Sequence, residues 1–284
     1  MKKWIGILVA LAVVGFIGYN IWAGGTTDET PTVRTAPIER GSISEMVSAT
    51  GTIEPSEKQE IVGQGLVSEL PVEVGDTVEE GDLLVSYMDG TTHEAAFAGT
   101  IVELNITEET IDSSAQKGTP SLVLSNLEDL EVALSLSKSD SALVKEGQEV
   151  ALTYGNSEYT GTVDFVAPVA TQTQSQLGTS STLATRIVFD ETPEEIVAGF
   201  DIDVDILVNS AEDVLILPIE ALLYDDENRP YAFVVENETA KKVELSIGIQ
   251  SPSGIEIVDG LEENDEVILS PTESIEDGSA VITE

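Results

Sequence analysis

Short runs of alternating apolar and polar residues follow one another from residue 33 to the C-terminus, separated by turns rich in Gly, Asp and Asn. A period of two is typical of strands, because successive side chains of a strand point to opposite faces. The clearest runs are LLVSY at 83–87, LEVALSL at 130–136, EVALT at 149–153 and YAFVV at 231–235. One short stretch, SKSDSALVK at 137–145, is a helix candidate. The pattern predicts an all-β fold.

The N-terminal run at 4–22, WIGILVALAVVGFIGYNIW, departs from this pattern, since Asn20 is its only strongly polar residue. About 20 apolar residues let a helix cross a bilayer. Lys2 and Lys3 precede the run, so the positive-inside rule predicts a cytoplasmic N-terminus and an extracytoplasmic body. Residues 1–23 are thus expected to form a transmembrane anchor and 24–32 a polar linker. A cleaved secretory signal is the alternative, although its apolar region usually has only about 7–15 residues.

Two stretches of the body resemble each other, residues 65–87 and 99–124. Both begin G-x-[VI]-x-E-L-x-[VI] and end in an apolar strand after polar turns. Two such halves resemble the flattened barrel of lipoyl and biotinyl domains. Carrier domains of that type present a modified Lys on the hairpin between their halves. Here the connector at 88–94, MDGTTHE, contains no Lys, so no cofactor is expected.

A lipoyl-like domain without its lysine, placed after a membrane anchor and followed by more strands, resembles the membrane fusion proteins. These are periplasmic adaptors of the haemolysin-secretion and macrolide-efflux type. The matching segments, in order, are VSATGTIEP at 47–55, the stretch 127–150, YTGTVDFV at 159–166, DVLILPIEAL at 213–222 and the stretch 243–269. The resemblance therefore covers nearly the whole body of the chain.

The resemblance implies a division of the body into four parts. Residues 33–55 would supply strands that pair with the barrel and membrane-proximal domains, and 56–125 would form the lipoyl-like domain. A β-barrel domain would follow at 126–211 and a membrane-proximal β domain at 212–284. Asn264 stands where the family usually has Gly in a turn, and Asn tolerates the positive φ that such a turn needs.

Many adaptors of this family insert a long α-helical hairpin between the two lipoyl halves, whereas this chain has only the short connector 88–94. A helix spanning 30 Å needs roughly 20 residues. The chain is therefore expected to lack the reach to a second membrane. This favours a single-membrane, Gram-positive bacterium, with the protein as a single-pass component of the cell membrane.

The net charge of the chain limits the classes of molecule that it can bind. The chain has 12 basic and 53 acidic residues, for a net charge of −41, and such a body repels the phosphates of nucleic acids. The acidic residues are spread along the chain, so solubility explains them, while attraction of cationic partners stays open. Cys is absent, which excludes disulfides, thiolate metal sites and Cys nucleophiles.

Few residues are candidates for catalysis or metal binding. His93 is the only His, and no Gly-x-Ser-x-Gly motif is present, so neither a catalytic triad nor a His-based metal site is expected. In FDIDVDI at 200–206, strand alternation places three Asp residues on one face and Phe200 with the other apolar residues on the opposite face. The Asp face is interpreted as the wet side of a barrel strand, with a weak cation site as the alternative. Residues 171–182, TQTQSQLGTSST, are expected to form a polar loop.

The resemblance implies a non-enzymatic adaptor of an export transporter. Its copies would form a trimeric or hexameric ring on an ABC-type permease with its ATPase subunit, and the lipoyl-like domains would line a central path. The turn at 107–117 is the candidate constriction of that path, with Gln116 as the candidate pore-lining residue. The alternatives are an adaptor of a proton-driven efflux transporter and a surface-anchored binding or structural module.

Overall fold

The computed structural model describes residues 30–175, 178–191 and 196–284. The apolar run 4–22, predicted to be the membrane anchor, lies outside the described residues. Within the described part of the chain, no helix is both long enough and apolar enough to cross a membrane.

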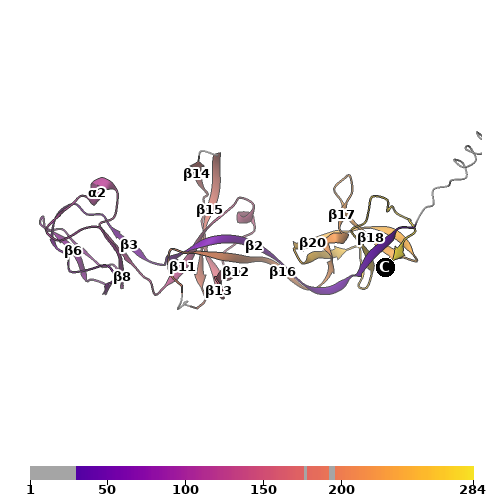
Figure 1. The fold of residues 1–284 in the computed structure, drawn as a ribbon, viewed down its shortest axis with the longest axis horizontal. Coiled ribbons are helices and arrows are strands. Elements are labelled where there is room, and N and C mark those ends of the chain that lie inside the picture. Colours follow the sequence, from indigo (N-terminus) through magenta and orange to yellow (C-terminus); the bar gives the residue numbers. More distant parts are fainter. Residues whose placement is uncertain (1–29, 176–177, 192–195) are drawn as a thin grey trace, which may run out of the picture. The chain divides into compact units, whose positions relative to one another are not determined.

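Strands dominate the described residues, which confirms the all-β prediction for them (Figure 1). Their helical segments are short: α2 (Ser114–Lys117) and the 3-10 turns η1 (Asp140–Ala142) and η2 (Ile219–Ala221). The helix expected at 137–145 is therefore wrong beyond η1. The hydroxyl of Ser137 donates to the Asp140 carboxylate at 2.6 Å, and such local side-chain bonds compete with helix formation.

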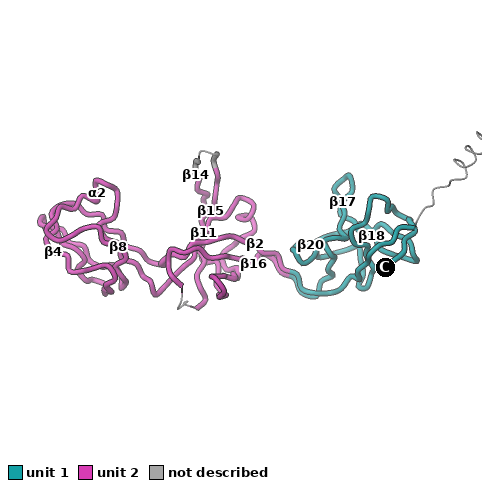
Figure 2. Tube along the Cα trace, in the orientation of Figure 1, with its two compact units in different colours: residues 1–43, 211–284 teal, residues 44–210 magenta. Residues whose placement is uncertain are grey.

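The chain forms two compact units (Figure 2). Unit 1 comprises residues up to 43 together with 211–284, and unit 2 comprises residues 44–210. Strands β2 (Glu39–Pro55) and β16 (Asp201–Leu217) have residues in both units. The finer domain boundaries expected from the sequence stay a prediction.

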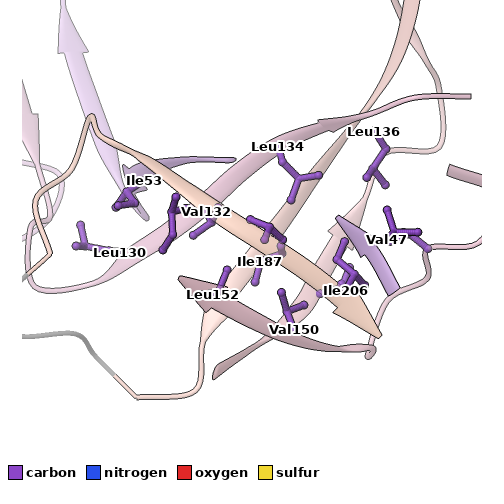
Figure 3. Close-up of a cluster of buried hydrophobic side chains, with 14 of the residues drawn as sticks. Val47, Ile53, Leu130, Val132, Leu134, Leu136, Val150, Leu152, Ile187 and Ile206 are labelled. Atoms are coloured by element: carbon purple, nitrogen blue, oxygen red, sulfur yellow. The ribbon is translucent and has the colours of Figure 1, made fainter. Parts of the chain in front are cut away.

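Unit 2 contains a closed barrel. Its strands pair in the order β12-β13-β15-β11-β2-β16, and β12 also pairs with β16, which completes the circle. The bounds not yet given are β11 (Leu130–Leu136), β12 (Glu149–Tyr154), β13 (Ser157–Val166) and β15 (Gly178–Phe189). Inward-facing aliphatic side chains of these strands form one buried cluster (Figure 3). Closure pairs every strand on both sides and so removes the exposed edges of an open sheet.

Strand β16 shows the predicted alternation. Its apolar residues Ile202 and Val204 are buried, whereas Asp201 and Asp203 are exposed. Phe200 does not share the inner face as expected, because it precedes the strand and its side chain is 56% exposed. Its ring instead lies 6.4 Å from the ring of Tyr154.

The polar segment 171–182 is paired rather than looped. Strand β14 (Thr171–Ser175) pairs antiparallel with the first residues of β15, from Thr171 opposite Thr182 to Ser175 opposite Gly178 (Figure 1). The expectation of a loop was wrong because Thr, which recurs in this segment, is frequent in strands, and the backbone groups of two strands form the ladder.

The other part of unit 2, here called the repeat domain (residues 58–125), consists of two four-stranded sheets. Their strand orders are β3-β10-β8-β5 and β7-β6-β4-β9. The strands are β3 (Lys58–Ile61), β4 (Gly65–Glu69), β5 (Thr77–Val78), β6 (Leu83–Tyr87), β7 (Thr92–Glu94), β8 (Gly99–Leu104), β9 (Ile111–Asp112) and β10 (Leu122–Ser125). Their inner faces share one apolar core.

Unit 1 is built on a sheet with the order β17-β18-β22-β1-β23, to which β19 adds by pairing with β18, and on the pair β20 and β21 beside the end of β16. Both faces of this sheet are covered, because neighbouring residues such as Phe233 and Val234 enter different apolar clusters. The strands are β1 (Thr32–Pro37), β17 (Leu223–Tyr224), β18 (Pro230–Glu236), β19 (Thr239–Glu244), β20 (Ser246–Ser251), β21 (Gly254–Asp259), β22 (Glu266–Leu269) and β23 (Ile282–Thr283).

One type of turn recurs in both units. In the turns at 73–76, 79–82 and 262–265, the carboxylate of the closing Asp accepts the backbone N–H of the first residue at 2.8 Å. The third residue is Gly in the first two turns and Asn264 in the last, where φ is 72°. Asn264 therefore takes the left-handed conformation that the sequence predicted for it.

Candidate functional site

The candidate site is the turn at 107–117 in the second half of the repeat domain, because the sequence singled out Gln116 there. The turn follows β8, contains β9 and ends in α2. Its geometry depends on how the two halves of the repeat domain are joined.

The two halves are interleaved through their middle strands. Strand β5 of the first half pairs with β8 of the second, and β9 of the second half pairs with β4 of the first. The registers match: Val78 lies opposite Gly99, and Asp112 lies opposite Gly65, the glycine that begins the other half. Val78 and Asp112 thus occupy equivalent positions, and both are buried, with 6% and 2% of their surface exposed.

Asp112 is the centre of a buried hydrogen-bond network. Its Oδ2 accepts the hydroxyl of Tyr87 at 2.7 Å and the hydroxyl of Ser121 at 2.6 Å, and its Oδ1 accepts the backbone N–H of Ser114 at 2.8 Å. The Ser121 hydroxyl in turn accepts the backbone N–H of Gly63 at 2.8 Å. These bonds join segments from both halves of the domain.

The network keeps Asp112 ionised. Burial opposes ionisation, but the hydrogen bonds from Ser121, Ser114 and Tyr87 outweigh it and hold the pKa of Asp112 below its ordinary value. Burial, together with the bond to Asp112, raises the pKa of Tyr87 to about 12. The site therefore contains a fixed negative charge and a neutral phenol across the physiological pH range.

Gly63 fits closely against this network. A Cβ at this position would lie 1.7 Å from the Tyr87 hydroxyl oxygen and 2.5 Å from Asp112 Oδ2. Any side chain here would displace both groups, so glycine is required by the close approach of the backbone to the network.

Helix α2 follows directly and carries Gln116, whose side chain is exposed. The helix ends at Gly118, which has a φ of 68° and donates its N–H to the Ser114 carbonyl. At the other end, the N-cap residue Ser113 makes no side-chain cap. The Ala115 N–H donates to the Gly63 carbonyl at 3.1 Å. The structure thus places Gln116 on a short, well-anchored turn at the domain surface.

The connector between the halves contains no helical hairpin. Residues 88–98 hold the short strand β7 and no helix, and the sequence contains no Lys in this range. His93 lies in β7 rather than at the tip of the turn, and its ring meets the ring of Tyr87 edge-on at 6.0 Å.

Three exposed apolar residues lie at neighbouring positions: Leu66 in β4, Ile111 in β9 and Met88 directly after β6. Leu66 lies opposite Ile111 in the β4–β9 pair, and the Met88 N–H donates to the Leu66 carbonyl. Their exposed fractions are 39% for Leu66, 70% for Met88 and 77% for Ile111. We call these three residues the apolar row.

The acidic stripe of β16 takes a structural role in the barrel. Asp205 accepts a hydrogen bond from Ser48 on the neighbouring strand β2, and Asp201 accepts one from Thr52 at 3.4 Å. Among the residues that the structure describes, no group of three or more His, Asp or Glu side chains is placed to hold a metal ion.

The buried network was not foreseen from the sequence. Tyr87 lies 25 residues and Ser121 lies 9 residues from Asp112 in the chain, and Asp in a polar turn is usually exposed. One signal was available, because aligning the two halves places Asp112 where the first half has Val78. A charged residue at an apolar position of a repeat indicates a buried carboxylate with dedicated partners.

Known proteins are similar to this chain in sequence and in fold. A family model described as the YknX C-terminal permuted SH3-like domain matches residues 214–283. The protein of Bacillus subtilis (strain 168) named as the efflux system component YknX is 24% identical over 382 residues, covering 99% of this chain and 100% of the relative. The aligned length exceeds the 284 residues of this chain, so the relative contains segments without a counterpart here.

Solved structures agree in fold. MacA from Actinobacillus actinomycetemcomitans superposes with a TM-score of 0.70 at 19% identity, covering 84% of this chain and 99% of that one. A MacA–MexA chimera that contains the Pseudomonas aeruginosa MexA α-hairpin domain gives a TM-score of 0.66 at 20% identity, covering 81% of this chain and 98% of that one. The chain is thus similar over nearly its whole length to an efflux system component, its residues 214–283 match a C-terminal domain model named after that protein, and its fold is that of MacA.

Proposed function

We propose that the chain is the extracytoplasmic adaptor subunit of an ABC-type exporter, held to the cell membrane by residues 4–22 and performing no chemistry itself. The observation that carries the proposal is the two-sheet repeat domain with a short connector that contains neither an attachment lysine nor a helical arm. A domain without a reactive group or a long reach is suited to lining or sealing a path rather than to carrying a substrate.

In this proposal several copies form a ring, with the second-half turns of the repeat domains around a central path. Gln116 is a suitable lining residue because its side chain is exposed while the backbone beneath it is anchored to a buried network. An uncharged amide can contact polar substrates of either sign without an electrostatic barrier. ATP hydrolysis in the partner would supply the free energy, and the ring would follow its conformational changes.

The apolar row supports contact between copies. With a net charge of −41, two copies repel each other over most of their surface. The row at Leu66, Met88 and Ile111 is uncharged and exposed, so it offers a strip where a second copy can approach and bury apolar area. We assign the row to the interface between neighbouring repeat domains.

Co-purification tests the partner. The tagged full-length protein is extracted gently from membranes of its own cells, and the proteins that come with it are identified. A permease together with an ATP-binding subunit is the expected result. A proton-driven transporter in their place would contradict the ABC assignment alone. The absence of any transporter would contradict the adaptor and favour a surface-anchored binding or structural module.

Cysteine cross-linking tests the ring and the path. Because the chain has no Cys, a single Gln116→Cys substitution gives one reactive site per copy. Copies whose second-half turns surround a common path should be joined in membranes by short bifunctional maleimides. The matched control is Glu80→Cys, which places a thiol at an exposed position of a first-half turn and should cross-link much less. Equal yields from the two variants would contradict the placement of Gln116.

A further inference from the structure

We propose that Asp112 is a positioning residue that fixes α2, and with it the direction of Gln116, relative to the core of the repeat domain. The inference rests on the proposed role of Gln116 at the central path. It goes further by naming the group that holds the second-half turn in place.

The comparison of the two halves shows that the fold itself does not need a carboxylate here. Val78 occupies the equivalent position in the first half, with the same register to the opposite strand, and an apolar residue closes that part of the core. Burying a carboxylate costs far more than burying a valine unless its hydrogen bonds are all made. The second half therefore retains Asp112 for something that the first half lacks.

The difference between the halves after this position is α2. Val78 leads into the turn at 79–82, which closes through the side chain of its own Asp82. Asp112 leads instead into Ser113 and the four-residue helix α2. A helix of this length is unstable alone, because its nucleation cost is not recovered by further turns. It needs support from outside itself.

Asp112 supplies this support at the first turn. The N-cap residue Ser113 leaves the helix without a side-chain cap, and Asp112 Oδ1 accepts the Ser114 N–H instead. The other oxygen of the same carboxylate accepts hydrogen bonds from the hydroxyls of Tyr87 and Ser121, whose residues are 3% and 0% exposed. One carboxylate thus connects the helix to two buried groups of the core.

A second connection runs parallel to the first. Gly63 accepts the Ala115 N–H with its carbonyl and donates its own N–H to the Ser121 hydroxyl. The helix can move away from the core only by breaking buried bonds on both routes. Leaving a buried donor without a partner is costly, so the turn has one preferred position.

Amide exchange of the full-length protein tests the inference. The variant Asp112→Val carries the residue of the equivalent first-half position. The Ser114 N–H then loses its acceptor, so the turn that contains Ala115 and Gly118 should open more often. The amides of these two residues should exchange about tenfold faster or more. Asp112→Asn keeps one oxygen for the Ser114 N–H and should restore most of the protection. The matched control Val78→Ala weakens the core at the equivalent position and should leave α2 no less protected than the rest of the domain.

Cross-linking connects this test to the path. In the Gln116→Cys background, Asp112→Val should reduce the yield between copies by more than half, whereas Val78→Ala should leave it near the parent value. Should Asp112→Val fail to fold, Ser121→Ala removes one of the two core hydroxyls and should produce a smaller rise in exchange at the same amides.

Unchanged exchange of Ala115 and Gly118 in both Asp112→Val and Ser121→Ala would overturn the inference. So would equal acceleration across the whole repeat domain, since that indicates general destabilisation. If Gln116→Cys does not cross-link in the parent protein, the central path is wrong, while the exchange data still decide whether Asp112 fixes the turn.

Discussion

The hydroxyl of Tyr87 donates a 2.7 Å hydrogen bond to Asp112, and both side chains are almost completely buried. The bond links the last residue of β6 in the first half to β9 in the second. It is therefore a polar side-chain contact between two halves that also share one apolar core. A buried bond to a charged acceptor is stronger than one between neutral groups.

Tyr87→Phe should destabilise the repeat domain by about 1.5–3 kcal/mol, the usual cost of losing a hydrogen bond to a charged group. Amide exchange of residues 58–125 in the full chain, measured at rising urea concentrations, gives the free energy of opening. Tyr231→Phe serves as control, since that residue lies in unit 1. A loss below about 0.5 kcal/mol would contradict the contribution of the bond.

The same pair predicts how this stabilisation depends on pH. Asp112 has a lowered pKa, so its contribution is present above its ordinary value of 3.8 and disappears as the pH falls below it. Tyr87 has a raised pKa of about 12, so its contribution is full below its ordinary value of 10.0 and is lost as the pH rises from there towards 12.

The free-energy difference between the parent protein and Tyr87→Phe isolates these two groups from the many other acids. It should be constant between about pH 5 and 9 and shrink on both sides of that window. A difference that already falls between pH 5 and 7 would mean that Asp112 is not held in its ionised form.

Gly63→Ala should be destabilising because its Cβ would lie 1.7 Å from the Tyr87 hydroxyl oxygen. Overpacking of this kind usually costs about 1–3 kcal/mol. In a Tyr87→Phe background the nearest atom is removed, so the same substitution should cost less, and a double-mutant cycle measures the difference. Additive costs would show that Gly63 and Tyr87 do not compete for this space.

Ile111→Asp should weaken association between copies without unfolding the repeat domain, because Ile111 is 77% exposed and lies in the apolar row. A carboxylate there adds repulsion to a surface that is already anionic. Cross-linking from Gln116→Cys and sedimentation of the solubilised protein measure the loss. Val74→Asp, also at an exposed apolar residue but on a first-half turn, should leave both readings unchanged.

The sequence predicted local features of the fold better than long-range ones. Alternation identified the inner face of β16, and the shared motif identified both halves of the repeat domain, because each depends on residues close together in the chain. The pairing of β5 and β9 with strands of the opposite half could not be predicted in this way, since strand pairing across the domain leaves no local pattern.

Of the candidate site, the sequence analysis named the exposed residue Gln116 but none of the buried residues beneath it. Gln116 was selected from a resemblance, and its exposure agrees with that choice without testing its role. Asp112 was missed because a carboxylate in a polar turn is normally solvated. Its burial depends on Tyr87, 25 residues away, and Ser121, 9 residues away, which reach it only in the folded domain.

Asn264 provides a last test, in unit 1. It holds a φ of 72° at the third position of the turn at 262–265, and its N–H donates to the Ile38 carbonyl at 2.9 Å. A β-branched residue cannot take this conformation without strain of roughly 1–2 kcal/mol. Asn264→Val should therefore accelerate amide exchange at Ile38, whose own N–H donates to the Asp265 carbonyl across the same turn. Asn264→Gly meets no such strain and should match or exceed the parent in protection of the Ile38 amide. Slower exchange in the Val variant than in the Gly variant would contradict the role of the left-handed backbone in this turn.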